Sequence, residues 1–168
     1  MKKIILAILV LFFVGCSNKV SEVFQKDDKY ITLTQCTQRG QIIKSFETIA
    51  LINATYLNPI LKNNETQKNE VFIIGVYNEN DYKGYKKGGV FNNHYQLTMN
   101  GLKFTKAIKA DNKTLNLKSY PFYNKWMKYY KVYFPKTDLG IDKLKITYTN
   151  LDKNVSVTLS IPKELYLE

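Results

Sequence analysis

LKITYT, residues 144–149, and VSVTLSI, residues 155–161, are the stretches of sequence that decide the fold. In both, apolar and polar side chains alternate, so that Ile146 and Tyr148, for example, are separated by a threonine. Alternation of this kind is typical of a strand that is buried on one face and exposed on the other. Because the connection over residues 150–154 is short, the sequence predicts that the two strands pair as an antiparallel hairpin.

Two regions earlier in the chain carry equally clear strand signals. Residues 70–78 hold valine, phenylalanine and isoleucine in an almost unbroken apolar run, which is typical of a central strand buried on both faces. Residues 95–99 and 102–108 flank Asn100-Gly101, and Asn-Gly favours the type I′ turn that joins two paired strands. We therefore expect a buried central strand and a second hairpin.

Weaker strand signals complete the pattern. Residues 30–37 are rich in β-branched and aromatic side chains, and the Gln-Arg-Gly sequence of residues 38–40 is a turn signal. Residues 41–56 fit a long bent strand or two short strands better than a helix, and residues 129–134 form a strand that Pro135 stops. Short strands separated by frequent turns predict an all-β antiparallel sandwich of about seven to nine strands.

The N-terminal segment has a different character. It begins with Lys2 and Lys3, continues with an apolar run over residues 4–14, and ends in Gly15-Cys16. A cationic start, a short apolar core and a small residue before cysteine are typical of a signal peptide that is removed. The run is too short for a permanent span, which needs roughly 17 to 25 apolar residues.

Residues 13–16, Phe-Val-Gly-Cys, resemble the lipobox of bacterial lipoproteins, with phenylalanine where leucine is commonest. The resemblance implies that Cys16 becomes the first mature residue. Its sulfur then carries a diacylglycerol and its amine a further acyl chain, and these chains hold the protein on a membrane. The expected organisation is a signal peptide over residues 1–15, a lipidated tether over 16–29 and a β-sandwich domain over 30–168.

The composition is strongly basic, with 25 lysine and arginine residues against 14 acids and a formal net charge of +11. Arg39 is the only arginine. For a protein outside the cytoplasm, this charge favours anionic lipids, acidic glycans or acidic proteins as partners rather than nucleic acid. Scattered surface lysines also fit a solubility role. With Cys16 acylated, Cys36 has no partner within the chain and is expected to be a small buried hydrophobic side chain.

Residues for catalysis are scarce. His94 is the only histidine, so a site with two histidine ligands for zinc is excluded and a histidine-dependent nucleophile would rest on this side chain alone. Its neighbours indicate an ordinary loop residue. The common hydrolase, metalloprotease and phosphate-binding motifs are absent from the sequence. The sequence therefore predicts that the protein is not an enzyme and uses neither a metal nor a cofactor.

Two segments could form a binding surface. Residues 120–134 are densely aromatic, and we expect an irregular or one-turn helical piece after Pro121 followed by a strand from Lys128. If one aromatic face is exposed, its rings and nearby lysines suit a sugar or a protein partner, whereas the alternative is that the rings are core. The loop over residues 82–89 is cationic, and it is either a contact surface for an anionic glycan or lipid or a solvated loop. The candidate residues are Tyr123, Trp126, Tyr129, Lys83, Lys86 and Lys87.

Asn154 is a candidate glycosylation site. The sequence Asp-Lys-Asn-Val-Ser over residues 152–156 resembles the extended acceptor of N-glycosylating epsilonproteobacteria, in which an acid stands two residues before the asparagine. Its predicted place at a hairpin tip favours accessibility. Four N-x-S/T sites occur in the chain, so an acid before one of them also arises readily by chance.

The lysine-rich and asparagine-rich body behind a lipobox is similar to small lipoproteins of Campylobacter and Helicobacter relatives, including a type with a variant immunoglobulin-like β-sandwich domain. The resemblance implies an envelope protein without an assigned enzymatic activity. We expect a binding or adhesion module for a protein or glycan, anchored through Cys16, and Ser17 favours the outer membrane. The alternative is a structural or assembly subunit of an envelope complex that binds its partner by strand addition. The oligomeric state stays open.

Overall fold

The computed structural model describes residues 28–61, 63–111 and 115–164. Strands β8 (Lys143–Asn150) and β9 (Val155–Pro162) pair as an antiparallel hairpin, in which Leu144 faces Ile161 and Ile146 faces Leu159. The inward side chains of β8 are fully buried, and Leu159 and Ile161 of β9 are buried with them. The hairpin predicted from the alternating stretches is therefore confirmed, and it forms one edge of a sheet.

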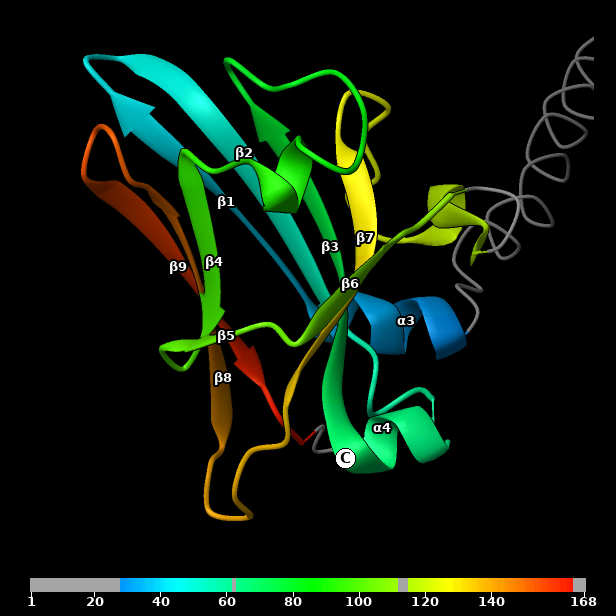
Figure 1. Cartoon of the computed structure of the whole chain (residues 1–168). Helices are drawn as coiled ribbons and strands as arrows, with labels where there is room; N and C mark the ends of the chain where they lie inside the picture. Colours follow the sequence, from blue (N-terminus) through cyan, green and yellow to red (C-terminus); the bar gives the residue numbers. More distant parts are fainter. Residues whose placement is uncertain (1–27, 62, 112–114, 165–168) are drawn as a thin grey trace, which may run out of the picture.

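The described residues form two antiparallel sheets packed as a sandwich (Figure 1). One sheet has the strand order β1-β2-β3-β7-β6 and the other β5-β4-β8-β9. The predicted all-β antiparallel sandwich is thus confirmed. In constant-type immunoglobulin domains the second and third strands lie in different sheets, whereas β2 and β3 pair here, so the likeness lies in the layers and not in the strand order. The remaining strands are β1 (Thr37–Lys44), β2 (Glu47–Tyr56), β3 (Asn69–Asn78), β4 (Tyr95–Met99), β5 (Leu102–Lys103), β6 (Lys106–Lys109) and β7 (Lys128–Pro135).

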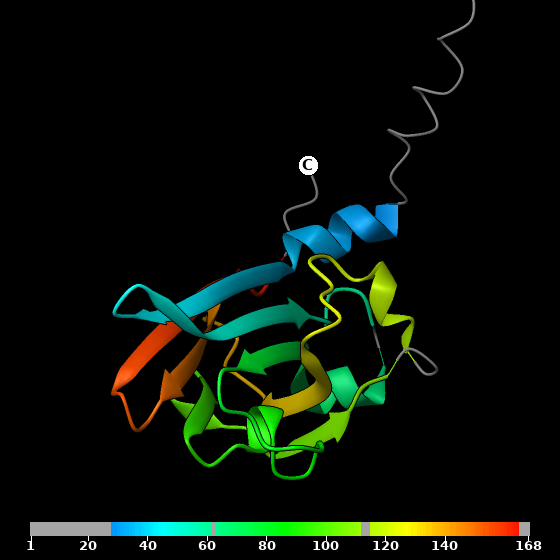
Figure 2. The same cartoon turned by 90° about the horizontal axis from the view of Figure 1, so that it is seen from above.

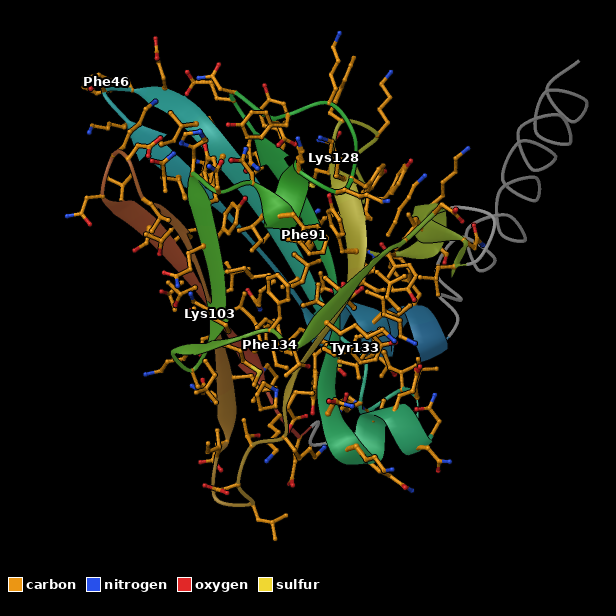
Figure 3. The ribbon with its side chains drawn as sticks, viewed as in Figure 1. Phe46, Phe91, Lys103, Lys128, Tyr133 and Phe134 are labelled. Carbon is orange, nitrogen blue, oxygen red and sulfur yellow. The ribbon has the colours of Figure 1, made fainter. Side chains whose placement is uncertain are left out.

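Strand β3 lies at the centre of the five-stranded sheet and is buried on both faces, as its apolar run predicts. Phe72 and Ile74 point to the inner core between the two sheets, where Phe134 of β7 meets Phe72 edge to face at 5.8 Å between ring centres. Figure 3 shows Phe134 in this interior position. Val71 and Ile73 point the other way, into a second apolar cluster on the outer face of the same sheet.

This second cluster exists because residues 115–127, here called the cover segment, cross the outer face of the five-stranded sheet before β7 begins. Leu117 of the short 3-10 helix η2 (Leu117–Ser119) and Met127 are buried there against Ile73 and Tyr133. In Figures 1 and 2 the cover segment lies on the side of the five-stranded sheet that faces away from β8 and β9. Of the two alternatives expected after Pro121, the irregular one is correct, since residues 121–127 form neither helix nor strand and the helical turn of the cover segment, η2, precedes Pro121. The strand starts at Lys128 as expected.

The second predicted hairpin is present, but its second strand is short. Asn100 and Gly101 have φ angles of 49° and 84°, as a type I′ turn requires. Strand β5 then ends at Lys103, and the chain crosses to the other sheet, where β6 pairs with β7. Phe104 marks the crossing, since its ring packs edge to face on Phe91 and Phe134, and this contact turns the chain into the core.

The strand predicted for residues 30–37 is wrong, because this segment forms the helix α3 (Asp28–Gln35). Leu33 and Cys36 lie three residues apart, at helical spacing, and both are buried. Thr37 at the end of the helix donates to the Leu33 carbonyl at 2.6 Å and pairs with Thr55 of β2 at 2.8 Å. This packing stabilises the helix although threonine and isoleucine have low intrinsic helix propensities. Cys36 is a free, buried thiol, and burial raises its pKa to about 11.

The turn predicted at residues 38–40 is also wrong, because these residues lie inside β1. Gly40 is required there by close packing: a Cβ atom on it would lie 2.7 Å from Val157 and 2.8 Å from Leu159 of β9. The turn lies at Ser45 and Phe46 instead, both with positive φ, and it joins β1 to β2. Of the two alternatives for residues 41–56, two strands are therefore correct.

Among the described residues, no helix has the length and apolar character needed to cross a membrane. Helix α3 begins at Asp28, within the segment expected to be a tether, and the signal peptide and Cys16 lie outside the described residues. The helix leads into β1, which ends at the Phe46 turn. Figure 3 shows Phe46 at the far tip of this hairpin, and its side chain is fully exposed.

Candidate functional site

The three aromatic candidates have different exposures. Trp126 is 71% exposed and Tyr123 is half-buried, but Tyr129 is only 5% exposed. The Tyr129 ring lies over Gly75 of β3, where a side chain would collide with it, and stacks on Tyr123 at 5.5 Å between ring centres. Burial raises the pKa of Tyr129. Tyr129 therefore supports the surface from below and does not face a ligand, in contrast to the sequence-based expectation.

Trp126 stands at a groove on the outer face of the five-stranded sheet, between strands β1 and β2 and the end of the cover segment. The groove has a volume of about 880 Å³, within the range of ligand-binding clefts. Its walls combine aromatic rings, amides and cations. It is lined by Arg39, Gly40, Gln41, Leu51, Asn53 and residues 122–127.

Hydrogen bonds fix the loop over residues 122–127 that forms one wall of this groove. Asn53 of β2 donates to the Phe122 carbonyl at 2.6 Å, which holds Phe122 at a positive φ of 58°. The hydroxyl of Tyr129 accepts from the Asn124 amide at 2.8 Å, and the Asn124 side chain accepts from the Trp126 amide at 2.9 Å. The exposed rings are thus presented on a preorganised loop.

Both cations of the groove lie against aromatic rings. The guanidinium carbon of Arg39 is 4.7 Å from the centre of the Phe122 ring, and Lys125 Nζ is 4.9 Å from the Trp126 ring. Such cation–π contacts hold the charged groups in place at the surface while leaving their hydrogen-bond donors available. None of the groove residues is acidic. The groove therefore offers flat apolar rings, amide groups and positive charge on one surface.

Lys83, Lys86 and Lys87 are exposed as expected, but none of them lines this groove. Their loop is fastened at its base by Asp81, whose carboxylate accepts from the Gly89 amide at 2.9 Å and from Lys128 Nζ at 2.7 Å. Burial opposes ionisation of Asp81, yet these hydrogen bonds outweigh it and lower its pKa. The structure thus separates the lysine loop from Trp126 and does not bring the predicted binding residues into one site.

His94 belongs to a polar cluster beside the lysine loop, which contributes Tyr82. Its Nδ1 lies 2.6 Å from Asp152 and its Nε2 lies 3.0 Å from the Tyr82 hydroxyl. This arrangement resembles an acid–histidine–hydroxyl relay, but His94 and Asp152 have side chains that are 42% and 61% exposed, so solvent screens the pair. The cluster joins the loop before β4 to the β8–β9 hairpin, a structural role that suits the expectation of an ordinary loop histidine.

Asn154 is exposed at the tip of the β8–β9 hairpin, where it has a φ of 49°. The predicted accessibility of this asparagine is therefore present, and its glycosylation stays a prediction. Lys153 beside it reaches Glu79 at 3.1 Å.

A buried carboxylate at the opposite end of the sandwich is structural. Glu70 at the start of β3 is fully buried and accepts hydrogen bonds from the Tyr56 hydroxyl at 2.6 Å, Asn58 at 2.8 Å and the Thr137 hydroxyl at 2.7 Å. Lys136 Nζ lies 3.4 Å away. Burial alone would raise the pKa of Glu70, but these donors and the lysine outweigh it and lower the pKa. The hydrogen bonds from Tyr56 of β2 and Thr137 meet on this carboxylate, so the network fastens the β7–β8 connection to β2 and β3.

Sequence reasoning identified Trp126 but missed Arg39, Asn53 and Phe122 as its neighbours. One signal was available, since Arg39 is the only arginine in a lysine-rich chain. The sequence predicts a turn at residues 38–40, whereas Arg39 lies in β1 and its side chain lines the outer face of the sheet. Comparisons with known protein families, curated proteins and solved structures found no match for this chain.

Proposed function

We propose that the protein is a non-enzymatic binding module of a bacterial cell envelope, anchored by lipid on Cys16, that holds a glycan or a protein. The resemblance of residues 13–16 to a lipobox supports the anchor, and Ser17 favours the outer membrane by analogy with sorting in other bacteria. The basic composition supports attraction to an anionic partner.

The groove beside Trp126 is the observation that carries this proposal. A tryptophan that is 71% exposed gains nothing for folding, yet the loop that presents it is fastened by three hydrogen bonds. Fixed aromatic side chains beside polar groups are the usual anchors of binding surfaces. The His94 cluster is exposed to solvent, so it supports a catalytic role less well than the groove supports a binding role.

The course of strand β1 relates the groove to the end of the domain that the proposed tether enters. The chain enters the described domain through α3, and β1 follows directly and carries Arg39. An eight-residue strand spans roughly 26 Å, so the Phe46 turn lies well away from the entry point. Arg39 is the third residue of β1, so a partner bound there would lie near the end of the domain at which α3 enters, and the Phe46 turn would point away from it.

The alternative, an assembly subunit that captures a partner by strand addition, has less support. Such capture needs an exposed strand edge with unpaired backbone groups. Of the four edge strands in the described sheets, β1 and β9 have eight residues each and pack against each other, with Gly40 of β1 facing Val157 and Leu159 of β9. The other two edge strands are short, since β5 has two residues and β6 has four with a lysine at each end. Short, lysine-flanked edges resist strand addition.

An envelope-binding assay tests the proposed function. The Cys16→Ala protein, which we expect to be released unlipidated, is incubated with envelope fragments of the producing bacterium and the bound fraction is measured. We expect binding that is lost in Arg39→Gln and Trp126→Ala variants, with Leu139→Ala as the matched surface control. Binding that is equal in all variants would contradict the role of the groove.

Surface proteolysis separates the two orientations of the anchored protein. Cleavage of the domain on intact cells supports a surface adhesion module. Protection until the outer membrane is opened supports a periplasmic binding partner instead.

A further inference from the structure

We propose that the groove binds an acidic glycan, a sugar chain with carboxylate groups, in which Arg39 and Lys125 bind the carboxylates and Trp126 stacks on a sugar ring. This inference rests on the proposed binding function and names the ligand class for the same groove.

The charge of the groove selects an anionic occupant. Arg39 lies exposed on β1 and Lys125 lies exposed on the opposite wall, and no lining residue is acidic. Neither cation takes part in a salt bridge among the described residues. Because the guanidinium presents its donors as a planar fork, it matches the two oxygens of a carboxylate.

The aromatic and amide groups favour a sugar. A sugar ring has an apolar face of C–H groups and an edge of hydroxyl groups. Trp126 supplies a large exposed ring for the face, and Gln41, Asn53 and Asn124 line the groove with amides for the hydroxyl groups. The volume of about 880 Å³ has room for more than one sugar ring.

A carboxylate suits this groove better than a phosphate does. A phosphate monoester carries about 1.5 to 2 negative charges and three acceptor oxygens at neutral pH. The groove has one guanidinium and one ammonium on opposite walls, and the second is a point charge on a flexible stem. One fork fully satisfies one carboxylate.

An acidic peptide is the less suitable occupant. Acidic peptides are recognised by clusters of arginines, by an open strand edge or by enclosed apolar pockets for anchoring side chains. The groove holds a single arginine, β1 is paired with β2 on the groove side, and the inner face of β1 packs on Val157 and Leu159 of β9 at Gly40. The exposed groove surface is rings and amides.

The fluorescence of Trp126 provides a direct test, because this residue is the only tryptophan in the chain. The Cys16→Ala protein is titrated with trigalacturonate and with neutral galactotriose, and the change in emission is followed to saturation. We expect saturable binding of the acidic trisaccharide and at least tenfold weaker binding of the neutral one. Equal affinity for the two would overturn the proposal.

Variants of Arg39 and Trp126 make this test more specific. Arg39→Gln should weaken trigalacturonate binding about tenfold, Arg39→Lys should weaken it less, and Lys145→Gln on the other sheet should bind like the unchanged protein. Calorimetry replaces fluorescence for Trp126→Ala, which should lose binding, and for Trp126→Phe, which should keep part of it. Undiminished affinity in Arg39→Gln would overturn the proposal, as would tighter binding of a galactotriose phosphate.

Treated envelope fragments distinguish a failure of this inference from a failure of the proposed function. Groove-dependent binding that survives proteinase K, is lost after periodate oxidation and is competed by trigalacturonate supports the acidic glycan. Groove-dependent binding that proteinase K abolishes identifies a protein partner, which overturns the inference and leaves the binding function standing. The absence of any groove-dependent binding overturns both.

Discussion

The outer face of the five-stranded sheet is divided into a covered half and an open half. Over β3 and β7 the cover segment buries Ile73 and Tyr133, whereas over β1 and β2 the same face is open and holds Arg39 beside the groove. All four strands belong to one sheet, and both halves contain aromatic and aliphatic side chains. The difference shows that, on this outer face, the side chains of the sheet are buried where residues 115–127 lie over them and exposed where the segment leaves them open.

The largest expected effect comes from weakening the cover. Leu117→Ala removes a buried side chain from the covered half and should lower the free energy of unfolding by about 3 kcal/mol. Leu139→Ala is the matched control, because Leu139 is fully exposed and its truncation should cost almost nothing. Urea denaturation measures both, and similar losses in the two variants would show that the cover is not structural.

The next largest effect is expected at Glu70, whose buried carboxylate lies on the inner face of the same sheet. Glu70→Gln replaces an acceptor by an amide that faces donors from Tyr56 and Thr137, and should lower the free energy of unfolding by about 2 kcal/mol at neutral pH. Because the folded pKa of Glu70 lies below its ordinary value of 4.5, its stabilisation is complete above about pH 4.5 and is lost as the pH falls through the folded value.

Denaturation curves at several pH values check this expectation. The difference between the unchanged protein and Glu70→Gln should be largest near neutral pH and should shrink on acidification. Asp81, whose pKa is also lowered, remains in both proteins and leaves each with some acid sensitivity. A difference independent of pH would contradict the assignment of a charged Glu70.

A smaller effect on stability is expected at Tyr129, which lies in the covered half and is hydrogen-bonded to the loop that carries Trp126. Tyr129→Phe keeps the buried ring but removes the acceptor of the Asn124 amide, and should lower the free energy of unfolding by about 1 kcal/mol. The loop carrying Trp126 should loosen as a result, so the anisotropy of tryptophan fluorescence should fall. Unchanged anisotropy would mean that other contacts alone hold the loop.

The smallest expected effect on stability lies in the open half. Trp126→Ala should change the free energy of unfolding by less than about 0.5 kcal/mol, because the side chain is 71% exposed. The same substitution should abolish groove-dependent binding to envelope fragments. A large loss of stability would place Trp126 with the covered residues and remove the contrast between the halves.

The sequence predicted those elements in which local pattern and packing agree. The run over residues 70–78 is apolar on both faces because both sides of β3 are covered, and Asn100-Gly101 forms the turn that its residue types favour. The β-branched side chains of residues 30–37 favour a strand, but the burial of Leu33 and Cys36 stabilises a helix, so local propensity gives the wrong element there.

The groove could not be predicted as a unit, because its walls come from distant parts of the chain. Arg39 and Asn53 face each other through the pairing of β1 with β2, and the 122–127 loop reaches them only after the cover segment has crossed the sheet. Gly40 indicated a turn in the sequence, whereas it provides room for Val157 of β9. Such contacts depend on sheet order, which local patterns do not encode.

The direct passage from α3 into β1 has a mechanical consequence. Tension between the start of α3 and a molecule held at Arg39 would cross only the first residues of β1 and leave most of the sandwich unloaded. The β1–β2 hydrogen bonds run across the strands, so this load would fall on the bonds near the Thr37 end of β1, and those towards the Phe46 turn would carry none of it.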